Sequence, residues 1–226
     1  NIKGTSDTVV LSNWFVSADN RIEQVQFADG TSWNAASLQA KIPGATEGDD
    51  FIAEDSASNL LQGLGGNDQL YGLGGNDTLD GGAGDDFLEG GAGSDVYLFK
   101  RGDGIDTISD GDDQAPSIDT IRFDASITPA DITLAVNNQH LELRINGTAN
   151  GTANGTADRL TLSGWFSRNR YNIEVIEFAD GTSWTAADIL KKLSTATEGD
   201  DYILGTDADN VLQGLGGNDT VEGGLG

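Results

Sequence analysis

Acidic residues recur at a fixed spacing in the glycine-rich part of the chain. Four consecutive words of nine residues, GLGGNDQLY, GLGGNDTLD, GGAGDDFLE and GGAGSDVYL, run from Gly63 to Leu98. Each word has Gly at most of its first four places, Asp at the sixth, and an aliphatic or aromatic residue at the eighth. Ca²⁺ takes about six to eight oxygen ligands from carboxylates and backbone carbonyls. The pattern therefore predicts calcium binding.

The same phase extends upstream and recurs near the end of the chain. Read backward from Gly63, EDSASNLLQ and ATEGDDFIA fit the word, and a second array begins at Ala196 with ATEGDDYIL, GTDADNVLQ and GLGGNDTVE. The predicted sixth-place ligands are Asp50, Asn59, Asp68, Asp77, Asp86, Asp95, Asp201, Asn210 and Asp219. The two Asn positions are the weakest of these, because a neutral amide replaces the acid.

Glycines of each word are predicted to supply carbonyl oxygens to the same cages. Gly permits a positive φ and brings carbonyls close together without a Cβ clash. Two words complete one turn of a solenoid, so each word stacks on the word two later, about 4.8 Å away. Asp50 is thus expected to face Asp68, and Asn59 to face Asp77. The assigned glycines are Gly48, Gly66, Gly75, Gly82, Gly84, Gly91, Gly93, Gly199 and Gly217.

A further acidic stretch follows the first array. Beyond Leu98 the phase slips by two residues and resumes as RGDGIDTIS, which places Asp106 at the sixth place with Asp103 and Asp110 close by. We interpret Asp103 and Asp106 as parts of a terminal calcium turn. A solvated acidic loop is the alternative.

The eighth-place residues are expected to point inward. They are Ile52, Leu61, Leu70, Leu79, Leu88 and Tyr97 in the first array and Ile203, Leu212 and Val221 in the second. A flexible glycine-rich linker is the alternative, but a linker has no reason to keep this phase. The apolar ladder is thin, so metal binding is expected to carry much of the folding energy.

The stretch between the two arrays has ordinary globular patterning. Apolar and polar residues alternate over 119–123, 132–136, 141–145, 160–162 and 173–178, which predicts half-buried antiparallel strands. Thr128 precedes a predicted helical turn, and Thr185 caps a predicted helix over Ala186–Leu193. The predicted fold is mostly β, with parallel β-roll (β-helix solenoid) arrays flanking a β-rich module that has one or two short helices.

A second, longer repeat organises the chain. IEQVQFADGTSW matches IEVIEFADGTSW, and its Trp33 and Trp184 lie 151 residues apart, as do all such pairs. The predicted domains are a truncated copy of the β-rich module capping the first roll (1–44), calcium β-roll 1 (45–114), the β-rich module (115–195) and the truncated start of calcium β-roll 2 (196–226). We interpret the chain as part of a longer tandem array.

Composition narrows the possible partners. Against 12 Lys and Arg stand 37 Asp and Glu, for a formal net charge of −25. Such a chain is repelled by nucleic acid and by anionic membranes, and it has no Cys and no apolar run long enough to insert in a membrane. HExxH and GxSxG motifs are absent, and the single His140 lies in a strand pattern. We therefore expect that the chain is not an enzyme.

The nonapeptides resemble the calcium-binding repeats of the RTX (haemolysin-type) family. The intervening unit resembles the haemolysin-type calcium-binding protein-related domain through DTIRF, SITPADITL, LSGWF and IEFADGTSWTAADI. The resemblance implies several bound Ca²⁺ ions in a parallel β-roll. It also implies type I secretion from a Gram-negative bacterium to the extracellular space or cell surface, with folding after export.

The leading functional hypothesis is a calcium-binding structural module of a large repetitive secreted or surface RTX protein, resembling an adhesin. One alternative is a calcium-dependent carbohydrate-binding or ligand-binding module that uses Trp14, Trp33, Trp165 and Trp184. Another is the C-terminal folding and secretion module of an RTX enzyme or toxin. The expected partners are calcium and neighbouring repeats of the parent chain. End-to-end self-association through the strand edge near residues 223–226 is a further possibility.

Overall fold

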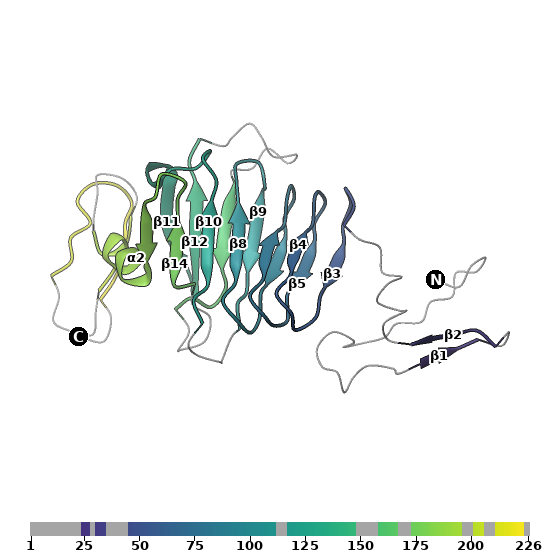
Figure 1. The fold of residues 1–226 in the computed structure, drawn as a ribbon. Helices are drawn as coiled ribbons and strands as arrows, with labels where there is room; N and C mark the ends of the chain where they lie inside the picture. The colour runs from purple at the N-terminus through teal and green to yellow at the C-terminus, as the bar shows by residue number, and fades with distance from the viewer. Residues whose placement is uncertain are drawn as a thin grey trace. The chain divides into compact units, whose positions relative to one another are not determined.

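Figure 1 shows the computed structural model of the chain, which describes residues 24–27, 30–34, 45–111, 117–147, 158–166, 173–195, 201–205 and 211–223. The chain divides into two compact units, residues 1–44 and 45–226. Within the described ranges, no helix is long and apolar enough to cross a membrane. The expectation that residues 1–44 cap the first roll stays a prediction.

The described part of the first unit is a hairpin. Strand β1 (Gln24–Gln26) pairs antiparallel with β2 (Ser32–Asn34). The rings of Phe27 and Trp33 pack edge to face with centroids 4.5 Å apart. Phe178 and Trp184, which lie 151 residues later, pack in the same way at 4.9 Å. The duplication in the sequence is therefore also a duplication in the structure.

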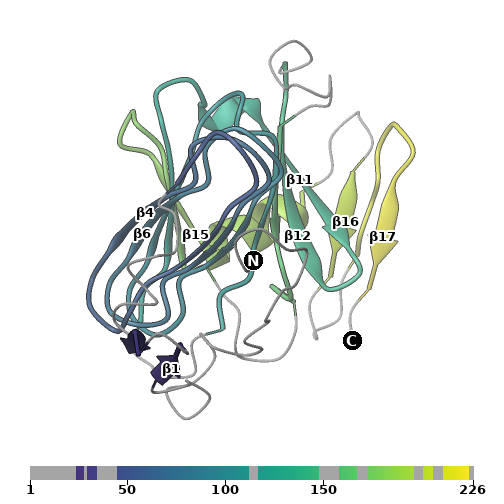
Figure 2. The same ribbon diagram turned by 90° about the vertical axis from the view of Figure 1, so that its right-hand side faces the viewer.

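The second unit begins with two parallel sheets that face each other. Their strands are β3 (Phe51–Ala53), β4 (Leu60–Gln62), β5 (Gln69–Tyr71), β6 (Thr78–Asp80), β7 (Phe87–Glu89), β8 (Val96–Phe99) and β9 (Ile105–Ile108). Odd-numbered strands pair in one sheet and even-numbered strands in the other, with Ile52 opposite Leu70 and Leu61 opposite Leu79. Successive turns of the chain overlie one another in Figure 2. This arrangement is the predicted parallel β-roll.

Both sheets continue past residue 114 into the β-rich module. The added strands are β10 (Thr120–Phe123), β11 (Ile132–Asn137), β12 (His140–Ile145), β13 (Arg159–Leu162), β14 (Val175–Glu177) and β15 (Ser183–Thr185). One sheet has the order β15-β14-β10-β8-β6-β4, and the other has the order β11-β12-β13-β9-β7-β5-β3. The roll and the module therefore share both of their sheets.

The prediction that all strands of this module are antiparallel is wrong in part. β10 is parallel to both β8 and β14, and β13 is parallel to β9. These strands continue the winding of the roll, and Ile121 of β10 stacks directly on the eighth-place Tyr97. The pairs β11–β12, β12–β13 and β14–β15 are antiparallel as predicted.

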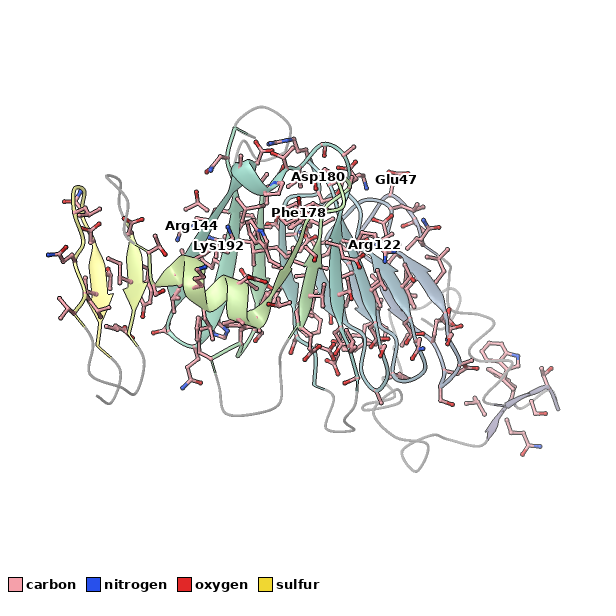
Figure 3. All side chains as sticks on the ribbon, turned by 60° about the vertical axis from the view of Figure 1, so that its left-hand side comes forward. Glu47, Arg122, Arg144, Phe178, Asp180 and Lys192 are labelled. Atoms are coloured by element: carbon pink, nitrogen blue, oxygen red, sulfur yellow. The ribbon has the colours of Figure 1, made fainter. Side chains whose placement is uncertain are left out.

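The two predicted helical segments are present. A 3-10 turn, η2 (Pro129–Asp131), begins after Thr128 with a capping box. Helix α2 (Ala186–Leu193) has Thr185 at its N-cap, and the Thr185 hydroxyl accepts a hydrogen bond from the Asp188 N–H. The helix buries Ile189 and Leu193 in the common core. Lys192, labelled in Figure 3, lies over the Trp184 ring at 4.2 Å.

The core of the roll is the predicted apolar ladder. Five of its eighth-place residues are at most 1% exposed, namely Leu61, Leu70, Leu79, Leu88 and Tyr97. Ile52 is half-buried and packs against this cluster. Each word thus contributes one inward side chain to a narrow core, which the larger apolar residues of the module extend.

The described part of the second array contains two paired strands. β16 (Tyr202–Leu204) pairs in parallel with β17 (Thr220–Glu222), and Ile203 is opposite Val221. Ile203 is 1% exposed, as predicted, whereas Val221 is 47% exposed. Val221 lies on the same face of the sheet as Ile203, but none of the described residues forms a further turn that covers it. Leu212 is half-buried and lies outside a strand.

Candidate metal centre

The sixth-place residues of the first array, together with two acids of the β-rich module, stack in two columns, one at each edge of the roll. The first column consists of Asp50, Asp68, Asp86 and Asp106. The second column consists of Asn59, Asp77, Asp95, Asp119 and Glu174. Each member lies just before a parallel strand of its sheet or, for Asp106, at the start of one, so the pairing of the strands sets the columns in register. The predicted stacking of Asp50 on Asp68 and of Asn59 on Asp77 is confirmed.

Beyond the first residue of each column, one carboxylate oxygen of each acid accepts the backbone N–H of the preceding member. Asp77 Oδ1 accepts the Asn59 N–H at 2.7 Å, and Asp95 Oδ1 accepts the Asp77 N–H at 2.7 Å. In the first column the same bond joins the Asp50 N–H to Asp68 Oδ1 at 2.8 Å. Charge-assisted bonds of this kind fix the orientation of each carboxylate. The second oxygen of each group is consequently held in a defined direction.

For three acids inside the columns, that second oxygen has no hydrogen-bond donor among the described residues, whereas Asp50 Oδ2 accepts the Thr46 N–H at 2.6 Å. Oδ2 of Asp68, Asp77 and Asp86 is buried and unpartnered, although each side chain is at most 3% exposed. A buried carboxylate oxygen without a donor or a cation is costly. A Cβ on Gly72 would overlap Asp77 Oδ2, so Gly at the first place leaves the room that this oxygen needs.

Glycine carbonyls line the same turns. Gly66 and Gly75 at the fourth place have φ of 108° and 99°, the left-handed region that Gly adopts at little cost. A Cβ on Gly84 would overlap the Gly66 carbonyl oxygen of the turn below. Of the other assigned glycines, Gly82, Gly91, Gly93 and Gly217 also have positive φ, and Gly48 does not. Closely stacked carbonyls and free carboxylate oxygens form the ligand set that suits a hard divalent cation.

Burial perturbs the titration of the column acids. Burial raises the pKa of Asp86 to about 6, and the negative charge of Asp68 adds to this increase. Burial also raises the pKa of Asp106 to about 9, and the negative charge of Asp86 adds to it. The pKa values of Asp68 and Asp77 are also raised, chiefly by burial. Negative charges stacked in a dry turn thus repel one another in the absence of a cation.

The two predicted ligands of the terminal turn, Asp103 and Asp106, have different surroundings in the structure. Asp106 continues the first column, because its Oδ1 accepts the Asp86 N–H at 3.1 Å. The Asp103 carboxylate is engaged by Lys100 instead, through the backbone N–H at 2.7 Å and through Nζ at 3.2 Å. Both acids are buried, so the alternative of a solvated acidic loop is wrong for this pair.

The remaining predicted residues have weaker support or lie outside the described ranges. Asp201 donates its N–H to Asp219 Oδ1 at 3.1 Å, which repeats the first-array bond. The amide of Asn59 donates to the Ala57 carbonyl of its own loop at 2.7 Å. Asn210 and Gly199 lie outside the described residues.

Two acids of the columns were not identified from the sequence. Asp119 and Glu174 lie outside the nonapeptide phase, but each precedes an inward apolar residue, Ile121 or Ile176, by two positions. Sixth-place Asp residues have the same relation to their eighth-place residues. This acid-x-aliphatic triplet was the available signal.

A parallel roll with free carboxylate and carbonyl oxygens along both edges defines a calcium-binding β-roll. Residues 56–97 and 195–226 match the RTX calcium-binding nonapeptide repeat (4 copies). Residues 1–37 and 140–188 match the haemolysin-type calcium binding protein related domain. The chain thus carries RTX repeats and two segments of the related domain, and it is a calcium-binding repeat module.

Solved structures similar to this chain include two repeat subunits of the Azotobacter vinelandii mannuronan C5-epimerase. AlgE6R2 is 28% identical, with a TM-score of 0.42, over 56% of this chain and 88% of that subunit. AlgE6R3 is 27% identical, with a TM-score of 0.38, over 54% of this chain and 77% of that subunit. No curated protein gives a significant match.

Proposed function

We propose that this chain is a structural module of a large repetitive RTX protein, secreted or displayed on a cell surface in the manner of an adhesin. In this proposal it folds when several Ca²⁺ ions bind after export. The proposal rests on the Oδ2 atoms of Asp68, Asp77 and Asp86, which are buried and accept no hydrogen bond from a described residue. These atoms lie along both edges of a roll that has a thin core. Cations between the turns would satisfy these oxygens and cancel their repulsion.

Energetics favour folding that depends on calcium. Each word of the roll adds one inward side chain to the core, whereas each sixth-place Asp adds a buried charge. When ligands are assembled only in the folded state, the free energy of metal binding adds directly to the free energy of folding. A Kd of roughly 10⁻⁴–10⁻³ M, as in extracellular calcium modules, leaves such sites empty in the cytosol and filled outside the cell.

The same proposal gives the chain no catalytic role. The single His140 is tied to the backbone, because its Nδ1 accepts the Gly164 N–H at 2.9 Å. Trp165 and Trp184 are each 6% exposed and pack in the core. Glycan binding through the faces of these two rings is therefore disfavoured, although the carbohydrate-binding alternative also included Trp14 and Trp33.

Circular dichroism tests the proposal directly. The β-sheet signal should be weak in EGTA and should return when Ca²⁺ is added in excess of the chelator. Addition of the same concentration of Mg²⁺ is the control, because Mg²⁺ is smaller and dehydrates reluctantly. A spectrum that is identical in EGTA and in Ca²⁺ would overturn calcium-dependent folding.

A further inference from the structure

Three buried acids from different segments meet where the roll passes into the β-rich module. Asp95 precedes β8, Asp110 follows β9, and Asp119 precedes β10. One carboxylate oxygen from each lies within 4.8 Å of the other two. The three residues are 0%, 3% and 3% exposed, respectively. The cluster is therefore compact and shielded from solvent.

Asp110 breaks the rule of the nonapeptide at this point. Leu88 pairs with Ile108 across β7 and β9, so Asp110 occupies the place that Gly90 has one turn earlier. A Cβ on Gly90 would overlap Asp95 Oδ2, which explains why the repeats have Gly at this first place. In the last turn the chain instead puts a carboxylate on the side where the sixth-place acids lie.

A longer connection makes room for this side chain. The hydrogen bond between neighbouring turns of the second column spans 18 residues from Asp77 to Asp95 and 24 residues from Asp95 to Asp119. The turn that contains Asp110 is thus six residues longer than a repeat turn; two of these residues come before β9 and four lie between β9 and β10. Neither the missing Gly nor the added length is expected if this turn merely continued the array.

The Asp110 carboxylate has no backbone donor among the described residues. Both of its oxygens are buried without a well-formed hydrogen bond, and the polar side chains that act on it are the Tyr97 hydroxyl and the Asp119 carboxylate. In contrast, Asp95 Oδ1 accepts the Asp77 N–H, and Asp119 Oδ1 accepts the Asp95 N–H. Burial of a carboxylate beside two others is very unfavourable unless a cation or protons compensate the charge.

We propose that Asp95, Asp110 and Asp119 form a cation site of a second kind, in which three carboxylates hold a hard divalent ion such as Ca²⁺. The nonapeptide cages combine glycine carbonyls with carboxylates, whereas this site supplies a charge of −3 from side chains. Oxygen-only ligands select Ca²⁺ or Mg²⁺ over softer metals. A bound ion would tie the last repeat turn to β10, the first strand of the module.

The test counts bound ions in the intact chain. Equilibrium dialysis against calcium followed by metal analysis should give one ion fewer per chain for Asp110→Asn than for the unmodified protein. Asp124→Asn is the matched control, because Asp124 is exposed and its carboxylate accepts hydrogen bonds only from Ser126 of the same loop. Asp110→Gly restores the residue type of the repeat and should also lose one ion. This variant decides the result if Asp110→Asn does not fold in calcium.

Thermal unfolding separates an ion site from a purely structural role. Asp110→Asn should raise the unfolding midpoint of the calcium-free protein, because it removes a buried charge, and it should reduce the gain that calcium produces. An unchanged ion count with an unchanged calcium gain would overturn the site and leave the calcium-binding roll intact. A chain that binds no calcium at all would overturn the proposed function as well.

Discussion

Asp77→Asn is the most informative single change in the roll. Asp77 lies in the middle of the second column, with Oδ1 bonded to the Asn59 N–H and Oδ2 buried without a donor. An Asn side chain keeps the first bond and replaces Oδ2 with an NH₂ group. That group cannot bind a cation. The substitution therefore removes a proposed ligand while it leaves the packing of the turn nearly unchanged.

The expected magnitude follows from binding linkage. An ion with a Kd of about 10⁻⁴ M stabilises the folded state by about 2.7 kcal/mol in about 10 mM calcium, a hundredfold excess over Kd. For a chain of this length, 1 kcal/mol shifts the unfolding midpoint by about 2–4 °C. Loss of one ion should thus lower the midpoint in calcium by about 5–10 °C. In EGTA the midpoint should stay or rise, because burial already raises the pKa of Asp77 and disfavours its charge.

Thermal unfolding followed by circular dichroism, in EGTA and in calcium, is the assay. Glu54→Gln is the control, because Glu54 is exposed and the change in net charge is the same. Equal losses in EGTA and in calcium would show that Asp77 acts only through packing. An unchanged midpoint in calcium would show that Asp77 does not hold an ion. Either result would refute the ligand assignment.

Two further predictions concern the backbone and pH. Gly84→Ala should cost at least about 3 kcal/mol of unfolding free energy in calcium, because its Cβ would overlap the Gly66 carbonyl. Gly102→Ala has no such neighbour and should cost only about 1 kcal/mol for its positive φ, so equal costs in urea titrations would contradict the stacked-carbonyl geometry. Without calcium, burial raises the pKa of Asp86 to about 6 and that of Asp106 to about 9, against about 3.9 in an unfolded chain. The stability from their protonation is complete below about pH 4 and is lost as the pH rises through the folded-state values. The unfolding temperature in EGTA should therefore decrease as the pH is raised from about 5 to about 9. The calcium concentration needed for folding should decrease over the same range. An unfolding temperature that increases with pH would contradict the burial of these acids.

The nonapeptide period was sufficient to predict the strands and the stacking of the roll from the sequence. Register follows from the period, because stacking words two apart places Leu61 on Leu79 and Asn59 on Asp77. Strand direction in the module could not be read in the same way. Alternation of apolar and polar residues reports which face is buried and is the same for parallel and antiparallel neighbours. β10 and β13 were therefore given the wrong direction relative to the roll.

Residues of the candidate site could be predicted only where the chain keeps the nonapeptide period. Asp103 was assigned because it lies close to Asp106 in the sequence, yet its carboxylate is engaged by Lys100. Asp110 was recognised as a neighbour without a role, since its position opposite Gly90 depends on the pairing of β7 with β9. Contacts that form across loops of irregular length depend on the tertiary fold, and a periodic pattern does not encode them.

The second column shows why the roll and the module behave as one structure. Its hydrogen bond from backbone N–H to carboxylate recurs at separations of 18, 18, 24 and 55 residues, so that connections of very different length are held to one spacing in the sheet. The last step joins the Asp119 N–H to Glu174 Oε2 at 2.8 Å, where β10 and β14 of the module begin. β14 then pairs with β15 in an antiparallel hairpin, and this pairing ends the parallel stack in that sheet. Ions that align the column acids would therefore also position the strands of the module, because the same backbone amides serve both.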